Sequence, residues 1–480
     1  MSKHVPRIVA VLPRGETLRN FVYSGTLDQV AGSVDLTVMS VLPSAELSAL
    51  LSSRFDDVRE LAPIAERVAV TRLRELLDVA HGRWLWSEAA QSRWRVRDSE
   101  ATTPALRLKR MVKKAACYPL ANRAGIRLLE RAERAASKWL RTTREYLELF
   151  ETLRPSLVFN ASHVHSPHAI QATQAAQWLG IPTATFIFSW DNLTSQGRII
   201  PSYDHYLVWN DDLRAQLLDI YRSVRPEQVS VTGTPQFDFH FRPEFRLTRE
   251  DFCRKVGADP SRPIVFYSTG MANPMFGEPR IVEGIADIVA GLDQFGPPQL
   301  LVRVYPKDRT GRFDDLKQRR PDILFPEVPW EPAWLTPKPE DSALLTNTLR
   351  HAAVGINAAS TISLELCMFA KPVVNVGYNP PGMNIWPWDY GRFYTFEHYR
   401  PVVESGAVAV ARSESQLREM LVDALRAPDA RAPQQRALMS RMFGSTLDGQ
   451  SGARVAECLV ALAGGPSTGA GRPLRTEIAC

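Results

Sequence analysis

The stretch AAVGINAASTISLELCMFAKPVVNVG, Ala352–Gly377, reads as a strand, a turn of small polar residues, a helix and a second strand entered through Lys371 and Pro372. This unit predicts a doubly wound α/β sheet. Where a parallel strand ends and a helix begins, several backbone N–H groups lack partners and the helix dipole adds partial positive charge. Such a turn therefore favours a phosphate group.

Three side chains near this turn suit a nucleoside diphosphate. Ser360 and Thr361 stand at the expected helix start, and Glu365 follows one turn later on the same helix face as Thr361. The hydroxyls and amides would hold the diphosphate, and the carboxylate would accept hydrogen bonds from ribose hydroxyls. A structural interpretation stays open, because Ser and Thr are common N-caps and a Glu in the first turn complements the helix dipole.

Length and composition indicate a globular protein of two domains. A chain of 480 residues exceeds what one hydrophobic core usually organises, and 45% hydrophobic with 23% charged residues is typical of soluble proteins. No apolar run reaches the roughly 18 residues of a membrane helix, and Ile8–Leu12 predicts a buried strand rather than a signal peptide. The 5 cysteines show no CxxC spacing, which argues against a zinc site or a disulfide framework and favours a reducing cytoplasm.

Positive charge is concentrated in residues 101–145, where twelve Lys and Arg accompany three Glu in a chain of net charge +6. Apolar residues recur there at helical spacing, so we expect amphipathic helices with basic faces. Two interpretations remain open, an ordinary solvated helix face and a surface that docks on an anionic membrane or a polyanionic acceptor. No nucleic-acid-binding motif is recognised, so nucleic acid is not expected as a partner.

The first half of the chain follows a parallel strand–helix pattern. Residues 44–150 are expected to be mostly helical, without a convincing strand. Strands are expected at Arg7–Leu12, Asp35–Val41, Ser156–Asn160, Thr183–Ser189 and His205–Trp209. Active-site groups of such sheets lie on loops after the carboxyl ends of strands.

Two of these loops carry the catalytic candidates His163, His165 and Asp191. A histidine at a strand end suits a general base or a donor to a leaving phosphate, and Asp191 is the rival base. Structural alternatives are histidines that act as caps or surface residues, and an Asx-type turn over Ser189–Asn192 with Trp190 as a plug. No metal site is expected, because no acidic or thiol cluster is spaced to complete one.

The second half begins a new α/β unit at Pro263–Thr269, with Thr269 and Gly270 opening the loop that follows. A later strand ends near Arg303 and Lys307, which suit a diphosphate but are also common as solvated cations.

The expected domain limits follow from these patterns. Residues 1–242 form a first Rossmann-like domain with a basic helical insertion at about 44–150, and residues 263–463 form a second. The polar residues 243–262 suit a linker, residues from about 433 to 462 a final helix, and residues 464–480 a disordered tail.

Several motifs resemble the GT-B glycosyltransferase superfamily. VRVYPKD and INAASTISLELCMFAKPVV are similar to the carboxy-terminal half of CDP-glycerol glycerophosphotransferases and related bacterial surface-polymer transferases. SWDNLTSQG, LVWN and VTGTPQFD resemble a bacterial group of GT-B-like proteins. The resemblance covers roughly residues 155–377. It implies two Rossmann-like domains, a carboxy-terminal helix that crosses back, a nucleotide donor on the second domain and an acceptor on the first.

The resemblance also implies roles for the residues singled out above. It places the ribose at Glu365, the phosphates at Ser360 and Thr361, and the diphosphate region near Arg303 and Lys307. The activation of the acceptor hydroxyl falls to His163, His165 or Asp191.

One departure stands out, because Tyr305–Pro306 occupies a place where such relatives often have His-Pro. A tyrosine supplies no cation, so either Arg303 and Lys307 carry that task or the donor chemistry differs.

The function expected from this resemblance is transfer of a sugar from a nucleotide-activated donor to a hydroxyl acceptor in bacterial surface glycan or glycolipid synthesis. No cofactor beyond the nucleotide-sugar co-substrate and no divalent metal is expected. The expected location is the cytoplasm or the inner face of the cytoplasmic membrane. Alternatives are a CDP-glycerol-type glycerophosphotransferase, a UDP-N-acetylglucosamine 2-epimerase-like isomerase and a non-catalytic nucleotide-binding assembly protein.

Overall fold

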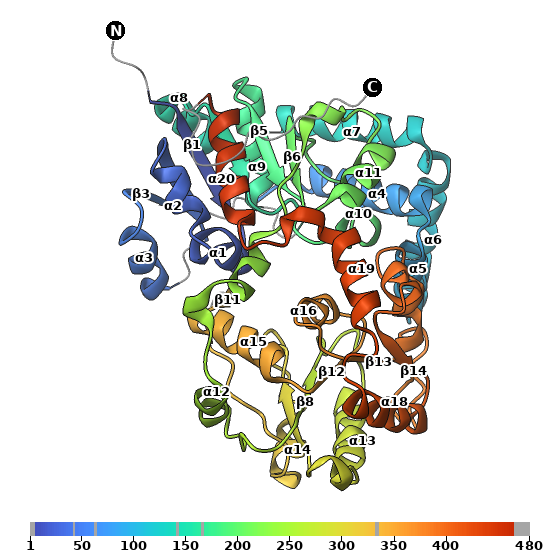
Figure 1. Ribbon diagram of the computed structural model, residues 1–480. Helices are drawn as coiled ribbons and strands as arrows, with labels where there is room; N and C mark the ends of the chain where they lie inside the picture. Colours follow the sequence, from blue (N-terminus) through green and yellow to red (C-terminus); the bar gives the residue numbers. More distant parts are fainter. Residues whose placement is uncertain are drawn as a thin grey trace.

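Two parallel sheets, one from each half of the chain, form the frame of this protein in the computed structural model (Figure 1). The structure describes residues 5–41, 44–61, 65–140, 144–164, 168–331 and 336–464. The first sheet has 7 strands in the order β3-β2-β1-β4-β5-β6-β7, and the second has 5 in the order β14-β13-β12-β8-β9. Each neighbouring pair in both sheets is parallel. The predicted α/β fold with two Rossmann-like units is confirmed.

The strands of the first sheet are β1 (Arg7–Leu12), β2 (Asp35–Ser40), β3 (Asp57–Glu60), β4 (Leu157–Asn160), β5 (Thr183–Phe186), β6 (His205–Val208) and β7 (Val229–Val231). Those of the second are β8 (Ile264–Ser268), β9 (Gln299–Arg303), β12 (Val354–Asn357), β13 (Val373–Val376) and β14 (Ala409–Ala411). A short antiparallel pair joins β10 (Trp330–Glu331) and β11 (Thr336–Pro337).

The α-helices up to β7 are α1 (Gly15–Leu18), α2 (Thr26–Ala31), α3 (Ala45–Ser52), α4 (Val68–Leu85), α5 (Glu88–Ser99), α6 (Pro104–Cys117), α7 (Arg123–Trp139), α8 (Arg144–Leu153), α9 (His168–Trp178), α10 (Asn192–Ser195) and α11 (Asp211–Ile220). Those that follow are α12 (Arg249–Val256), α13 (Glu278–Ala290), α14 (Asp314–Arg319), α15 (Pro339–His351), α16 (Ile362–Met368), α17 (Arg400–Glu404), α18 (Glu414–Arg426), α19 (Ala432–Phe443) and α20 (Ser451–Leu462).

The strands are apolar runs because both faces of each sheet are covered. Along β1, Ile8 and Ala10 belong to one hydrophobic cluster, and Val9 and Val11 belong to another on the opposite face. In the second sheet, Gly355 of β12 allows α16 to pack closely. A Cβ added there would lie 2.1 Å from Leu366 Cδ1. This contact fixes the start of α16 at the carboxyl end of β12.

The structure corrects four sequence expectations. The helical insertion contains the edge strand β3, whose sequence DVRE lacks an apolar face. The expected linker, residues 243–262, contains α12, which packs against α15. The apolar segment Ile323–Phe325 also predicts a strand from its sequence, but it forms only one bridge, from Leu324 to Leu301. The expected final helix is two helices, α19 and α20.

The carboxy-terminal helix crosses back, as the resemblance implied. In Figure 1, α19 runs beside the second sheet and α20 returns to the first. There α20 packs on α2, with Gly452 beside Thr26. The expected disordered tail falls almost entirely on residues 465–480, which lie outside the described residues.

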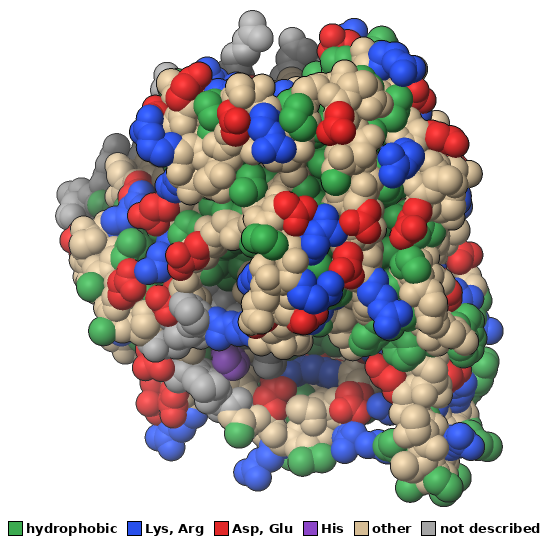
Figure 2. Space-filling model, turned by 90° about the horizontal axis from the view of Figure 1, so that it is seen from below, with side chains coloured by type: hydrophobic (Ala, Val, Ile, Leu, Met, Phe, Trp, Pro, Cys, Tyr) green, Lys and Arg blue, Asp and Glu red, His purple; other side chains and the backbone are tan. Residues whose placement is uncertain are grey.

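The surface carries charge of both signs. On the face of Figure 2, which is the lower side of Figure 1, Lys and Arg side chains are interspersed with Asp and Glu. Among the described helices, none is both long and apolar enough to cross a membrane.

Candidate functional site

A cavity of about 230 Å³, called here the first chamber, lies where the two sheets face each other. Its lining residues come from loops of both sheets and from the segment after β7 that connects them. They include Glu16, Arg19, Ser189, Gln236, His240, Tyr305, Asp341, Thr361 and Glu365. Thr361 and Glu365, predicted to share one helix face beside a crevice, thus line the same cavity.

The Glu365 carboxylate is held by a histidine that precedes the second sheet in the chain. His240 Nε2 lies 2.9 Å from Glu365 Oε2, and His240 Nδ1 lies 3.0 Å from Thr346 Oγ1. Both side chains of the pair are buried. The imidazole therefore ties the connecting segment to α15 and α16 and fixes the position of the carboxylate in the first chamber.

The turn before α16 uses several of its polar groups internally. Asn357 Oδ1 accepts hydrogen bonds from the Ser360 amide at 3.1 Å and from Ser363 Oγ at 3.0 Å. Ser360 Oγ accepts one from the Ile362 amide at 3.1 Å. Ser360 thus stabilises the turn itself. Thr361 Oγ1 instead accepts a hydrogen bond at 3.3 Å from Trp190 Nε1, which belongs to the first half of the chain.

Arg303 and Lys307 are both paired with carboxylates. Arg303 Nη2 lies 2.8 Å from Asp341 Oδ2, and Lys307 contacts Glu16 of the first half. Both cations thus have carboxylate partners in the structure, and their contact with a diphosphate stays a prediction.

Arg19 is the cation with neutral partners. Its guanidinium donates to Asn20 Oδ1 at 3.0 Å and to Gln236 Oε1 at 3.1 Å. Burial lowers the pKa of Arg19, while Glu365 and Asp341 act in the opposite direction. An anion in the first chamber would meet this side chain directly.

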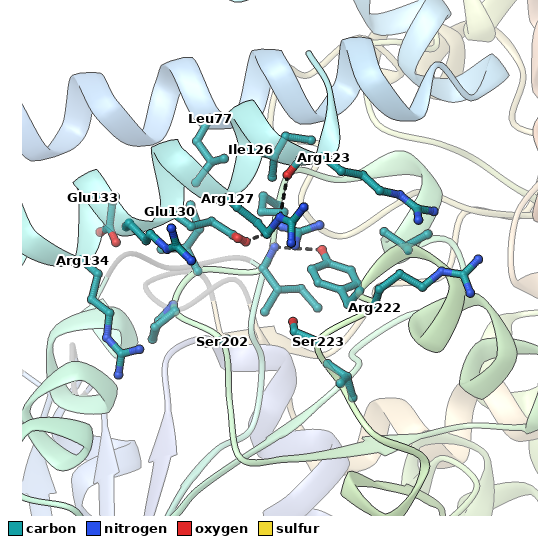
Figure 3. A pocket seen from close by; sticks show the side chains of 18 of the residues that line it. Leu77, Arg123, Ile126, Arg127, Glu130, Glu133, Arg134, Ser202, Arg222 and Ser223 are labelled. Atoms are coloured by element: carbon teal, nitrogen blue, oxygen red, sulfur yellow. Dashed lines mark hydrogen bonds and ion pairs between the residues drawn. The ribbon is translucent and has the colours of Figure 1, made fainter. Parts of the chain in front are cut away.

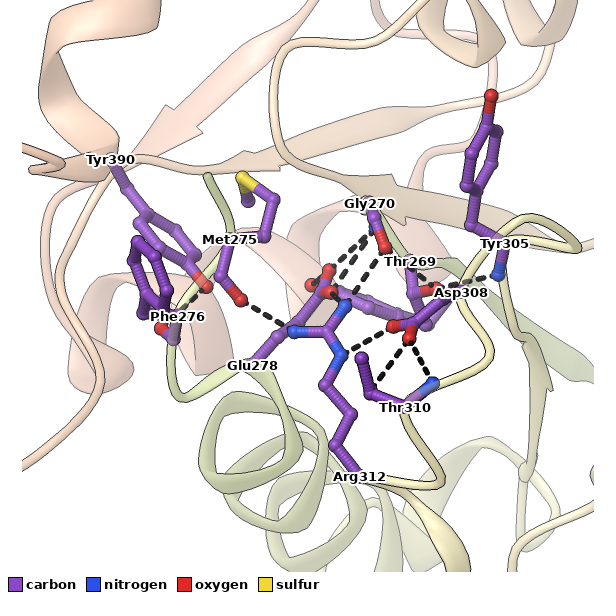
Figure 4. Close-up of polar contacts among 11 residues, drawn as sticks. Thr269, Gly270, Met275, Phe276, Glu278, Tyr305, Asp308, Thr310, Arg312 and Tyr390 are labelled. Atoms are coloured by element: carbon purple, nitrogen blue, oxygen red, sulfur yellow. Dashed lines mark hydrogen bonds and ion pairs between the residues drawn. The ribbon is translucent and has the colours of Figure 1, made fainter. Parts of the chain in front are cut away.

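Thr269 and Gly270 belong to a polar network behind the loop after β8 (Figure 4). The Gly270 amide donates to Glu278 Oε1 at 2.9 Å, and its carbonyl accepts from Arg312 Nη2 at 2.8 Å. Thr269 Oγ1 accepts from the Tyr305 amide at 2.8 Å. Burial raises the pKa of Glu278 to about 7 despite Arg312. These contacts hold the loop in place. They engage Thr269 and Gly270, which we expected to hold the donor, in hydrogen bonds within the protein.

A larger cavity of about 600 Å³, called here the second chamber, opens on the other side of Trp190. Ser189 and Thr361 line the first chamber, whereas Asp191 and Ala359 line the second, so the Trp190–Thr361 contact lies between them. Trp190 thus occupies the place of the predicted plug. Helix α5 of the insertion supplies one wall of the second chamber.

Asp191 and His398 are the titratable pair of this second chamber. Asp191 Oδ2 accepts a hydrogen bond from Ser195 Oγ at 2.5 Å. His398 packs edge-on against Trp190, with ring centroids 5.1 Å apart. Burial lowers the pKa of His398, and Asp191 opposes that shift. Asp191 is therefore the predicted base that reaches a cavity between the two halves.

Of the other two predicted bases, only His163 belongs to the described residues. His163 Nδ1 lies 3.2 Å from the Phe186 carbonyl, and burial lowers the pKa of His163 to about 4, so this imidazole is neutral at physiological pH. It is not among the residues that line either chamber. His165 lies outside the described residues. Within the part of the chain that the structure describes, no group of His, Cys, Asp or Glu is arranged to hold a metal ion.

A further cavity of about 450 Å³ lies in the first half, between α7 and the segment that precedes β6 (Figure 3). Its lining combines apolar side chains with several arginines. Among these are Leu77, Ile126, Arg123, Arg127, Arg134 and Arg222. Arg198 stacks on Tyr221, 4.0 Å from the ring centroid, and pairs with Glu130 at 2.7 Å.

Sequence reasoning missed Arg19, His240 and His398. Arg19 follows the first strand in a segment that reads as a loop leading into a helix. An arginine in such a segment does not by itself indicate a binding role. His240 lies two residues after the motif VTGTPQFD, and a polar aromatic residue near that motif was the available signal. His398 lies in an aromatic loop with no periodic pattern.

No family model matches the chain, and no curated protein matches its sequence. Solved structures do resemble it. A UDP-N-acetylglucosamine 2-epimerase superposes with a TM-score of 0.55 at 13% identity, over 96% of this chain and 97% of that one. The Neisseria meningitidis UDP-GlcNAc 2-epimerase bound to UDP-GlcNAc gives 0.54 at 12% identity, over 95% and 100%. The Methanocaldococcus jannaschii UDP-GlcNAc 2-epimerase in complex with UDP-GlcNAc and UDP gives 0.52 at 13%, over 95% and 99%.

Likeness at such low identity shows the fold alone. That fold is the GT-B arrangement of two Rossmann-like units facing each other, which the sequence resemblance implied.

Proposed function

We propose that this protein is a glycosyltransferase that moves a sugar from a nucleotide-activated donor to a hydroxyl acceptor. The observation that carries the proposal is the pair of chambers on either side of Trp190. A transfer reaction needs a donor site and an acceptor site that meet at one point, whereas an isomerase needs only the first.

The first chamber suits the donor. Arg19 and the turn at Thr361 supply positive charge and a hydroxyl for a diphosphate, and Glu365 supplies an acceptor for ribose hydroxyls. Solved structures of the same fold are described as holding UDP-GlcNAc or UDP, so a uridine nucleotide is the first donor to test.

The second chamber suits the acceptor, with Asp191 as the base. The acceptor hydroxyl loses its proton to Asp191 as its oxygen forms a bond to the anomeric carbon. The bond from that carbon to the diphosphate oxygen breaks, and the nucleoside diphosphate leaves with the electron pair. Arg19 stabilises the negative charge that develops on the leaving group.

The first test is a thermal shift of the whole protein against UDP, CDP, GDP, ADP and their sugar or glycerol conjugates. A ligand at about a hundred times its dissociation constant stabilises the fold by about 2.7 kcal/mol. A shift with CDP and CDP-glycerol alone would favour the glycerophosphotransferase alternative. Binding without any release of nucleotide would favour the assembly protein.

The second test separates binding from transfer with Asp191→Asn. This variant should keep the thermal shift with nucleotides. Its rate of GlcNAc transfer from UDP-GlcNAc to an alkyl glycoside, measured as UDP release, should fall by about 10²- to 10⁴-fold. Asp211→Asn, which alters an exposed carboxylate on α11, serves as the matched control. Normal release in Asp191→Asn would refute the assigned base.

A 2-epimerase-like isomerase is the second candidate, favoured by the His240–Glu365 pair in the first chamber and by the fold shared with solved epimerases. Epimerisation of a carbon without redox chemistry breaks its C–H bond. UDP-GlcNAc incubated in D₂O without an acceptor should therefore gain deuterium on the sugar if the protein is an epimerase. Mass spectrometry of the recovered nucleotide sugar decides between the two candidates.

A further inference from the structure

Three basic side chains of helix α6 are partly buried and paired. Arg110 and Lys114 pair with Asp98 at 2.8 and 2.6 Å, and Lys113 pairs with Glu75 at 3.1 Å. The exposed face of the helix carries Arg107 and Lys109 together with apolar side chains. Leu108, Met111 and Val112 are 62%, 64% and 61% exposed. Because they are three and four residues apart, they form one continuous stripe.

Helix α7 adds to the same kind of surface. Leu128 is 60% exposed and Trp139, at its last turn, is 84% exposed. Of the twelve strongly exposed large hydrophobic side chains in the described chain, eight lie between residues 106 and 140. An apolar face of this extent is unusual on a soluble protein and marks an interaction site.

Basic side chains flank this apolar face. On α7, Arg127, Arg131 and Arg134 stand beside Leu128, and Lys138 precedes Trp139, all of them exposed. The same arginines border the apolar cavity of Figure 3. The face therefore combines apolar side chains, an exposed tryptophan and excess positive charge.

We propose that the outer face of α6 and α7, called here the docking face, binds the surface of an anionic lipid bilayer. The apolar stripe and Trp139 would enter the boundary between headgroups and acyl chains, while the arginines neutralise anionic headgroups. A second copy of this chain fits less well, since it would bring two like-charged faces together. Charge complementarity thus selects the bilayer.

The docking face lies close to the second chamber. Arg97 of α5 and Glu100, which follows that helix, line the chamber and also line a groove bordered by Leu106 and Lys109 of α6. The end of α5 therefore lies between the second chamber and α6. Resting on the proposed function, this proximity indicates an acceptor that is anchored in the membrane by a lipid.

Sedimentation of the full chain with lipid vesicles tests the docking face. We expect the protein to pellet with vesicles of phosphatidylcholine and phosphatidylglycerol, to remain in solution with phosphatidylcholine alone, and to be released by salt. The double variant Leu108→Glu, Met111→Glu should bind the anionic vesicles at least tenfold more weakly. Val5→Glu places one such negative charge at an exposed apolar residue outside the docking face and should leave vesicle binding unchanged.

A second pair of substitutions isolates the electrostatic part. Arg131→Gln and Arg134→Gln should each weaken binding to the anionic vesicles by about fivefold. Equal binding of the native protein and the Leu108→Glu, Met111→Glu variant would overturn the proposal. So would a dimer, measured by light scattering, that this variant dissociates.

The nucleotide shift keeps this test independent of the proposed function. The Leu108→Glu, Met111→Glu protein should retain the thermal response to UDP, because its substitutions lie on an exposed surface. A native protein that responds to UDP but does not bind anionic vesicles would refute the docking proposal and leave the proposed function standing. Vesicle binding with no response to any nucleotide would refute the proposed function alone.

Discussion

At the scale of single residues, the first chamber depends on side chains that reach it from distant parts of the chain. Glu365 could be noticed in the sequence, but Arg19 and the residues that contact these two side chains could not. The 2.9 Å contact of Glu365 with His240 joins positions 125 residues apart, and the contact of Lys307 with Glu16 joins the two halves. Local pattern predicted which loops matter, and only the three-dimensional structure showed which of their side chains are already neutralised.

His81 gives a pH-dependent prediction at the same scale. It lies within α4 against Trp84 and Tyr221, with ring centroids 5.6 and 6.1 Å away. Among the described residues, neither of its ring nitrogens has a hydrogen-bond partner. Burial, reinforced by Arg198 and Arg93, lowers the pKa of His81 to about 3 from the ordinary 6.5.

Between these two pKa values the unfolded chain binds a proton that the folded protein excludes, so the free energy of unfolding falls as the pH drops below 6.5. The loss amounts to about 2 kcal/mol at pH 5. In His81→Phe the loss of stability between pH 8 and pH 5 should be smaller by about this 2 kcal/mol, while His163, whose pKa is also lowered by burial, keeps its own contribution. Urea unfolding at pH 5 and pH 8 measures the difference. An unchanged difference between the two pH values would place the titrating group elsewhere.

At the scale of elements, the buried strands were predictable because their apolar runs need only local information. The edge strand β3 and helix α12 were not, since DVRE and REDFCRKV are polar segments whose structure depends on the partners they meet. The division between α19 and α20 was missed for a similar reason. Asp238, from the distant segment after β7, starts α20 by accepting from the amides of Ser451 at 3.2 Å and Gly452 at 2.8 Å.

The Asp238 carboxylate stabilises the start of α20. Asp238→Ala leaves two amides of a buried helix start without an acceptor and removes a charge that complements the helix dipole. We expect the free energy of unfolding to fall by about 2 kcal/mol, measured by urea denaturation. Asp448→Ala removes a partly exposed partner of Arg454 on the same helix and should cost below about 1 kcal/mol. Equal costs for the two would show that Asp238 does not hold the helix.

At the scale of the whole molecule, the cleft is closed by contacts between its two halves. The Glu16 carboxylate pairs with Arg14 of its own half at 2.8 Å and with Lys307 of the other half. Burial, with Arg14 beside it, lowers the pKa of Lys307 to about 7, so an anionic ligand in the adjoining chamber would favour the protonated amine and complement the charge of the cluster. The sequence could not predict this cluster, because Glu16 and Lys307 lie in segments that meet only after both sheets have formed.

The same cluster predicts an asymmetry between two neutralising substitutions. Lys307→Met leaves the Arg14–Glu16 pair balanced, so the halves should stay together and stability should change little. Glu16→Gln instead removes the carboxylate between Arg14 and Lys307. At pH 6, below the Lys307 pKa of about 7, two cations then face each other with little solvent, which should cost about 3 kcal/mol and open the cleft. Small-angle X-ray scattering should then show a larger radius of gyration for Glu16→Gln alone, and saturating UDP should reverse the change if its diphosphate replaces the missing carboxylate. Equal radii for the two variants would mean that this cluster does not govern how the halves close.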